Sequence, residues 1–226
     1  MALQRRWCWV VALALVVLGV SVASSAEHPA TMLWNFDSVS LGDLPRGWKV
    51  EATGRQSPLA TWEVIEDTTA PSPPKVLSLT RVNHRSWGTF NLCWTRGVSF
   101  LDGEITVKLK ANSGRIDQGG GVMWRVQDRN NYYVARFNPL EDNFRAYYVK
   151  NGVRHQVASA QVHLPPGQWV TMRVIQKGEA FRCYLNGRLL LQGSLNVFAG
   201  PGGVGLWTKA DAATSFDDFT VRLLSR

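Results

Sequence analysis

The sequence is poor in cysteine and histidine, with 3 and 4 of these residues in 226. Zinc sites built from paired Cys and His residues, and catalytic centres with several histidines, therefore have few residues to draw on. A transmembrane helix needs about 20 apolar residues, and no such run follows the N-terminal segment. Adjacent basic residues occur only at Arg5 and Arg6. Nucleic-acid binding usually requires a clustered basic patch, so we expect no nucleic-acid partner. The lack of a long apolar run likewise predicts no membrane span in the mature chain.

The N-terminal segment has the three parts of a secretory signal peptide. Two arginines precede an apolar run of 11 residues at 10–20, and Ser24 and Ala26 then provide a small-x-small cleavage site. We therefore predict a signal peptide over residues 1–26, a single mature domain over residues 27–226, and a secreted or periplasmic location. An uncleaved N-terminal anchor is the alternative. Cleavage would leave six more basic than acidic residues, spread along the chain.

Two cysteines remain after this cleavage, and an oxidising compartment would allow them to pair. In the alternating pattern, Leu92 and Trp94 form the apolar face that we expect to face the core, so Cys93 points away from it, whereas Cys183 shares the apolar, inward face of Phe181. Side chains on opposite faces of a sheet cannot form a disulfide without distortion. We therefore predict that Cys93 and Cys183 are unpaired thiols.

The mature chain alternates between apolar and polar residues over short runs, and no window of about 12 residues has the spacing of an amphipathic helix. Representative runs are residues 105–110, 122–127, 132–137, 144–149 and 170–174. Turn signals separate the runs, including Asn-Gly pairs at 151–152 and 186–187, which are typical of tight hairpins. The pattern predicts about 12 to 14 strands. We expect an all-β fold, an antiparallel two-sheet jelly-roll sandwich.

A set of polar and aromatic residues shares the strand faces that point away from the predicted core. Its members are Arg125, Gln127, Tyr132, Arg136, Arg145, Tyr147, Trp207 and Lys209. An exposed indole such as Trp207 can stack on a pyranose ring, and guanidinium and amide groups can donate hydrogen bonds to hydroxyls. We therefore predict a carbohydrate-binding face. A solvated sheet face, covered by arginine and lysine stems, is the alternative.

Two blocks of the sequence resemble a known fold group. Residues 119–128 (GGGVMWRVQD) and 131–138 (NYYVARFN) form the first block, and residues 202–211 (GGVGLWTKAD) with 216–219 (FDDF) form the second. They resemble the concanavalin A-like lectin and glucanase sandwiches, and within that group the bacterial 3-keto-disaccharide hydrolase domain family, over most of residues 31–224. The resemblance implies a sandwich that binds or hydrolyses carbohydrate, because this fold supports several activities.

The carboxylate pattern of the glucanase branch is broken in this chain. That branch has Glu-x-Asp-x-x-Glu on one strand, which lines the cleft with carboxylates, but Thr106 stands two residues after Glu104. A hydrolase of the 3-keto-disaccharide type would need another pair, and Asp211 with Glu141 or Asp142 is the candidate. If the domain is not an enzyme, the open face binds glycan without turnover or contacts a protein partner.

Carboxylates on the first and last predicted strands suggest one further site. Related folds often carry a structural calcium ion, so the resemblance makes Asp37 and Asp218 a candidate pair of oxygen ligands. Turn capping and surface charge are the alternative explanation for both residues. We expect no other cofactor.

Overall fold

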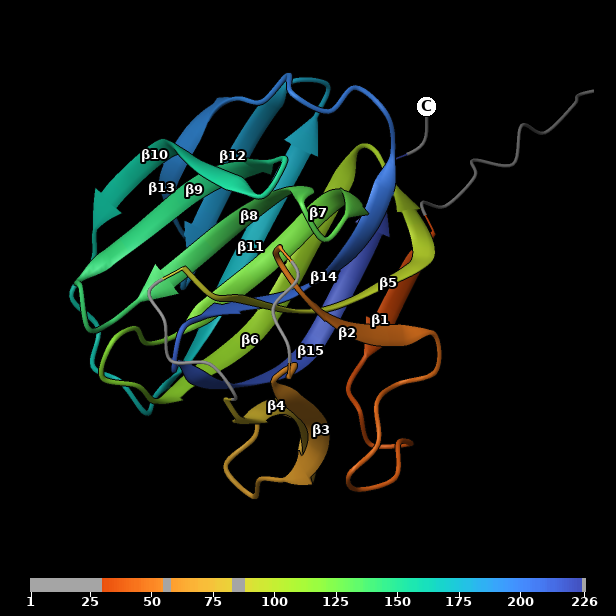
Figure 1. Ribbon diagram of the computed structural model, residues 1–226, viewed down its shortest axis with the longest axis vertical. Helices are drawn as coiled ribbons and strands as arrows, with labels where there is room; N and C mark the ends of the chain where they lie inside the picture. Colours follow the sequence, from red (N-terminus) through yellow and green to blue (C-terminus); the bar gives the residue numbers. More distant parts are fainter. Residues whose placement is uncertain (1–29, 55–57, 83–87, 225–226) are drawn as a thin grey trace, which may run out of the picture.

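The structure is a computed structural model that describes residues 30–54, 58–82 and 88–224. The signal peptide predicted for residues 1–26 lies outside these ranges. Fifteen β-strands in two antiparallel sheets make up the described part, which contains no α-helix and so no helix that could cross a membrane (Figure 1). The predicted all-β, antiparallel two-sheet sandwich is confirmed, with slightly more strands than the about 12 to 14 expected.

The larger sheet has eight strands. In spatial order they are β13 (Arg188–Ser194), β12 (Ala180–Leu185), β11 (Trp169–Lys177), β6 (Gly103–Ser113), β15 (Ala213–Leu223), β4 (Lys75–Arg81) and β3 (Thr61–Glu66), with β1 (Thr31–Trp34) also paired to β15. The smaller sheet has seven. In spatial order they are β10 (Val153–Gln161), β9 (Asn143–Lys150), β8 (Asn131–Asn138), β7 (Gly120–Asp128), β14 (Gly202–Lys209), β5 (Phe90–Phe100) and β2 (Trp48–Ala52). Strands β7 to β10 are therefore neighbours both in sequence and in space.

The two Asn-Gly pairs form the hairpin turns that the sequence predicts. Asn151 and Gly152 join β9 to β10, and Asn186 and Gly187 join β12 to β13. All four residues have positive φ, between 48° and 82°. Asparagine and glycine tolerate this conformation, and its twist matches the twist of the flanking strands. These turns fix the registers of β10 and β13.

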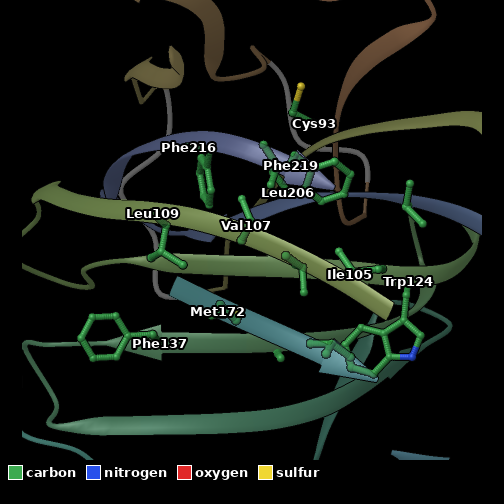
Figure 2. Close-up of a cluster of buried hydrophobic side chains, with 14 of the residues drawn as sticks. Cys93, Ile105, Val107, Leu109, Trp124, Phe137, Met172, Leu206, Phe216 and Phe219 are labelled. Atoms are coloured by element: carbon green, nitrogen blue, oxygen red, sulfur yellow. The ribbon is translucent and has the colours of Figure 1, made fainter. Parts of the chain in front are cut away.

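The main core lies between the two sheets (Figure 2). The smaller sheet contributes Trp124, Phe137 and Leu206, and the larger sheet contributes Ile105, Val107, Leu109, Met172, Phe216 and Phe219. Burial of each large side chain of this kind stabilises the fold by about 1.5–3 kcal/mol. The inner faces predicted for β6, β8, β9 and β11 from their alternation are those that line this core.

The smaller sheet is apolar on its outer face as well. A second buried cluster there comprises Phe90, Leu92, Trp94, Met123, Val126, Tyr132, Val134, Tyr147, Val149 and Trp207. The expectation that Leu92 and Trp94 face the core between the sheets is wrong, because Cys93 faces it instead. Gly203 leaves room for the Trp94 ring, since a Cβ there would lie 2.8 Å from ring atoms. Strand β5 thus buries both of its faces, and alternation alone does not tell which one is inner.

Cys93 and Cys183 are both free and fully buried. The prediction of unpaired thiols is confirmed, but its reason is wrong, because both side chains belong to the core between the sheets. Burial raises the pKa of each thiol above its usual range. A thiol that stays protonated is a weak nucleophile.

A chain that starts at residue 27 is therefore expected to resist Ellman's reagent while folded, at about pH 8. After unfolding in guanidinium chloride without reductant, two thiols per chain are expected to react with the reagent. An unfolded chain without reactive thiols would reveal a disulfide, and rapid labelling of the folded chain would contradict the burial of both cysteines.

Candidate functional site

Strand pairing places functional groups in one row across the outer face of the smaller sheet. On β8, Arg136 lies opposite Arg145 of β9 and opposite Gly121 of β7. Gly121 in turn lies opposite Trp207 of β14, and Lys209 follows two residues later on the same face. The structure thus brings together six of the eight residues predicted for this face: Tyr132, Arg136, Arg145, Tyr147, Trp207 and Lys209.

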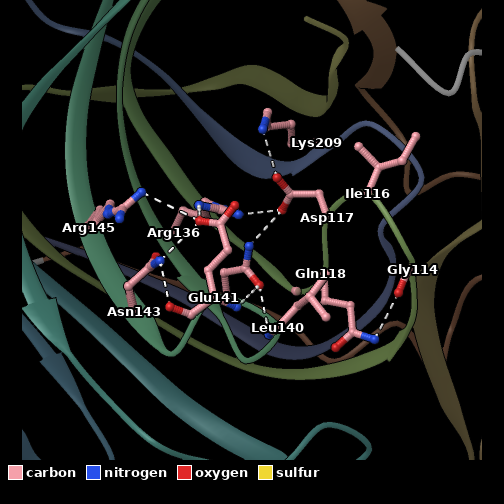
Figure 3. Close-up of polar contacts among 12 residues, drawn as sticks. Gly114, Ile116, Asp117, Gln118, Arg136, Leu140, Glu141, Asn143, Arg145 and Lys209 are labelled. Carbon is pink, nitrogen blue, oxygen red and sulfur yellow. Dashed lines mark hydrogen bonds and ion pairs between the residues drawn. The ribbon is translucent and has the colours of Figure 1, made fainter. Parts of the chain in front are cut away.

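A buried carboxylate lies at the centre of the polar part of this row (Figure 3). Asp117 Oδ1 accepts a hydrogen bond from Arg136 Nη2 at 2.5 Å, and Asp117 Oδ2 accepts one from Lys209 Nζ at 2.9 Å. Asn138 also donates to Oδ1, at 3.1 Å. Buried charges are tolerated when they are paired and hydrogen-bonded in this way. Sequence reasoning missed Asp117 because it lies in the loop before β7, where no periodicity assigns a face.

Glu141 forms the accessible rim of the same cluster. Its Oε2 accepts hydrogen bonds from Asn143 at 3.0 Å, Arg136 at 3.3 Å and Arg145 at 3.5 Å, and its side chain is 32% exposed. Although burial opposes it, the Asn143 amide and the Arg136 guanidinium lower the pKa of Glu141. The carboxylate is therefore ionised at neutral pH and available as an acceptor or a base. Asp142, the other candidate, contacts exposed His163 instead.

Trp207 is fully buried, so the expectation of an exposed indole is wrong. Its Nε1 donates to the hydroxyl of Tyr132 at 3.1 Å, and that hydroxyl also lies 2.8 Å from Thr53 Oγ1. The Phe90 ring lies 5.2 Å from the Trp207 ring. Trp207 and Tyr132 therefore belong to a buried aromatic floor beneath the polar side chains. The outer face of the smaller sheet is apolar at this point, and other side chains cover it.

Arg154 of β10 covers part of this floor. Its Cζ lies 4.4 Å from the ring centroid of Tyr147, 5.1 Å from that of Phe90 and 6.0 Å from that of Trp207. A guanidinium over aromatic faces is held by cation–π attraction and by packing of its flat surface. Alternation alone does not single out Arg154, because its contacts reach strands as distant from β10 as β5.

The structure does not bring Arg125 and Gln127 to the site. Arg125 has a φ of 46°, and the β7–β8 register shifts between Trp124 and Asp128. The Arg125 guanidinium instead donates to the carbonyl oxygens of Leu101, Phe198 and Gly178. Gln127 donates to the carbonyl oxygen of Pro201. Placing both residues on the open face was wrong, because a bulge changes the alternation within β7.

Asp211 supports the loop that carries Asp117. Its carboxylate accepts hydrogen bonds from the backbone N–H groups of Arg115, Ile116 and Asp117, at 2.8, 3.0 and 3.0 Å respectively. Although burial opposes it, these three bonds lower the pKa of Asp211. Asp211 therefore acts as a positioning residue for Asp117, while Glu141 is the carboxylate that faces the site.

Asp37 and Asp218, the candidate calcium ligands, have other partners. Lys75 Nζ donates to the carbonyl oxygens of Asp37 and Val39 at 3.0 and 2.8 Å, and Lys75 N donates to the Asp37 carboxylate. Asp218 forms an ion pair with Lys108 at 3.3 Å. Within the described ranges, no three His, Cys, Asp or Glu side chains gather as a metal site. A structural calcium ion at Asp37 and Asp218 therefore stays a prediction, and the ammonium groups of Lys75 and Lys108 argue against it.

Replacing Asp211 with asparagine is expected to lower the free energy of unfolding by about 1–2 kcal/mol at neutral pH. A carboxyl whose pKa is lowered by folding stabilises the fold above its unfolded pKa, about 3.9, and loses this contribution as the pH falls through the folded value. In urea unfolding, the gap between wild type and Asp211→Asn should therefore be wider at about pH 7 than at about pH 2.5, which lies below the unfolded pKa. Glu66→Gln, at an exposed position, is the control. A gap that is constant or widens with acid would contradict this role.

Removal of divalent cations is expected to leave the melting temperature unchanged. The reason is that the Lys75 ammonium contacts the oxygens that a calcium ion near Asp37 would need. The measurement is thermal unfolding with EDTA and, separately, with excess calcium chloride. A lower melting temperature in EDTA that calcium restores would show that the chain holds a structural ion.

Comparison with known proteins agrees with the observed fold. The levanase of Bacillus subtilis (strain 168) is 24% identical over 205 residues, which is 89% of this chain and 26% of that protein. A carbohydrate binding module from Bacillus subtilis, CBM66, superposes with a TM-score of 0.59 at 21% identity, over 78% of this chain and 95% of the module. The β-glucanase of Bacillus licheniformis superposes with a TM-score of 0.56 at 12% identity, over 86% of this chain and 98% of the enzyme.

The chain spans about a quarter of the length of that levanase. Its sequence also matches the family described as the 3-keto-alpha-glucoside-1,2-lyase-like domain, over residues 35–222. This match confirms the family resemblance expected from residues 119–138 and 202–219. With nearly all of the described sandwich inside the match, the chain belongs to the family of 3-keto-alpha-glucoside-1,2-lyase-like domains.

Proposed function

We propose that this domain is exported and binds carbohydrate on the outer face of the smaller sheet. The site would comprise Arg136, Glu141, Asn143, Arg145, Tyr147 and Arg154. One observation carries the proposal: an ionised, partly exposed carboxylate, Glu141, lies between guanidinium and amide donors. Sugar hydroxyls both donate and accept hydrogen bonds, so they suit a rim that offers charged groups of both kinds.

The similar proteins support this class of ligand. One is named as a carbohydrate binding module and another as a levanase. The signal-peptide pattern of residues 1–26 supports export, which would place the domain where extracellular glycans occur. A protein-binding role for the same face is the competing outcome of the experiment below.

Binding is tested by isothermal titration calorimetry of the chain from residue 27 with a panel of fructan, glucan and uronate oligosaccharides. We expect saturable binding by at least one probe, and at least tenfold weaker binding after Arg145→Met or Glu141→Gln, which corresponds to about 1.4 kcal/mol or more. Arg182→Met, an exposed arginine on β12 of the other sheet, is the matched control. Unchanged binding in Arg145→Met and Glu141→Gln, or no binding by any probe, would contradict the proposal.

A second candidate function is elimination from a 3-keto-glucoside at the same site. The C2–H bond next to a C3 ketone is acidic, and Glu141 is an ionised carboxylate beside cationic groups. Glu141 would take the C2 proton, and the electron pair would form an enolate at C2 and C3. Collapse of the enolate would restore the C3 carbonyl, form the C1=C2 bond and break the C1–O bond, and the departing oxygen would take up the proton held by Glu141. Arg136 and Arg145 would stabilise the enolate oxygen electrostatically.

Turnover is tested by incubating a 3-keto-α-glucoside with the protein and measuring the released aglycone. Release of aglycone that Glu141→Gln slows by about 100-fold or more, and that Arg182→Met leaves unchanged, would establish that the domain is an enzyme. Carbohydrate binding without any release would show a binding domain instead.

A further inference from the structure

The charges at the proposed site are unevenly matched. Asp117 is shared by Arg136 and Lys209, and Glu141 is shared by Arg136 and Arg145. Both carboxylates of the cluster are therefore already engaged with these three cations, as Figure 3 shows. The remaining cation is on Arg154, and no carboxylate pairs with it among residues 30–54, 58–82 and 88–224.

Arg154 is also short of hydrogen bonds. Its Nη1 is buried and has no hydrogen-bond partner in the described part of the chain, and the same holds for the hydroxyl of Tyr147. Tyr147 is only 2% exposed, and its ring lies 4.4 Å from Arg154 Cζ. Nearby, Arg136 Nε is a third buried donor without a partner. Buried donors without acceptors are costly, at about 1–3 kcal/mol each and more for charged groups.

The guanidinium of Arg154 and the hydroxyl of Tyr147 would be served by the same kind of ligand, whereas the Arg136 side chain is too deeply buried to be reached. Guanidinium N–H groups only donate, and a tyrosine hydroxyl can donate to a strong acceptor. A carboxylate offers two acceptor oxygens and a negative charge, and it pairs with a guanidinium through two parallel hydrogen bonds. A neutral hydroxyl supplies a weaker acceptor and no charge.

The electrostatic environment favours an anion in the same way. Burial and the nearby positive charge of Arg136 lower the pKa of Arg154 below that of a free guanidinium. A bound carboxylate would offset both effects. The stacking of Arg154 on Tyr147, Phe90 and Trp207 holds the planar group in place, so little side-chain entropy is lost when a ligand pairs with it.

We propose that the ligand is an acidic sugar, and that the carboxylate of a uronic-acid residue pairs with Arg154 next to the hydroxyl of Tyr147. The hydroxyls of the same sugar contact the rim at Glu141 and Arg145. This inference rests on the proposed function, because it assigns the class of carbohydrate to that site. It differs from the neutral substrate implied by the family description.

The test compares each uronate oligosaccharide with its methyl ester, which keeps the shape of the sugar and removes the charge. Calorimetry uses galacturonate, mannuronate and glucuronate oligomers and their esters, with the chain from residue 27 at low salt. At least one acid is expected to bind at least tenfold more tightly than its ester. Arg154→Gln is expected to abolish this preference, whereas Arg182→Gln on the opposite sheet is expected to retain it.

A milder variant keeps the test valid if Arg154→Gln unfolds the protein. Tyr147→Phe removes only a hydroxyl and should reduce the preference for the acid while leaving the melting temperature close to that of the wild type. Equal binding of acid and ester, binding of neutral glycans alone, or a preference that survives both variants would overturn the acidic-sugar inference and leave the carbohydrate site standing. Failure of every acidic and neutral probe to bind would overturn the proposed function too.

Discussion

The buried carboxylate of Asp117 is the interaction on which the polar end of this sandwich depends. It joins the loop before β7 to Arg136 on β8 and Lys209 on β14, in a place where an unpaired charge would be strongly destabilising. Asp211 holds the backbone of that loop by three hydrogen bonds. Once Arg136 is fixed in this way, Glu141 and Arg145 take their positions around it.

A second constraint is that the smaller sheet must bury both of its faces. One face packs on the larger sheet, and the other carries the cluster that includes Trp94, Tyr132 and Trp207. Arg154 lies across this outer cluster with its guanidinium over the rings. The result is a polar rim around a buried aromatic cluster, an arrangement that suits a ligand with hydroxyls and one charged group.

Much of the fold follows from local patterns, and the site follows from them only in part. The alternation on β8 and β9 placed Tyr132, Arg136 and Arg145 on the outer face, because residues two apart share a face of a regular strand. It failed at Arg125, where a bulge interrupts β7. It also gave no account of Asp117 and Arg154, whose roles depend on a loop conformation and on contacts across several strands. Exposure is equally non-local, which is why Trp207 was expected at the surface.

The central claim is that carbohydrate binds on the outer face of β8, β9 and β10. Backbone amide chemical shifts of the ¹⁵N-labelled chain from residue 27, recorded while a uronate or neutral oligosaccharide is added, test it most directly. The predicted result is a saturable set of shifts around Arg136, Glu141, Arg145 and Arg154, with the amides of β12 and β13 unchanged. Saturable shifts confined to the larger sheet, or no shifts with any oligosaccharide, would contradict the claim.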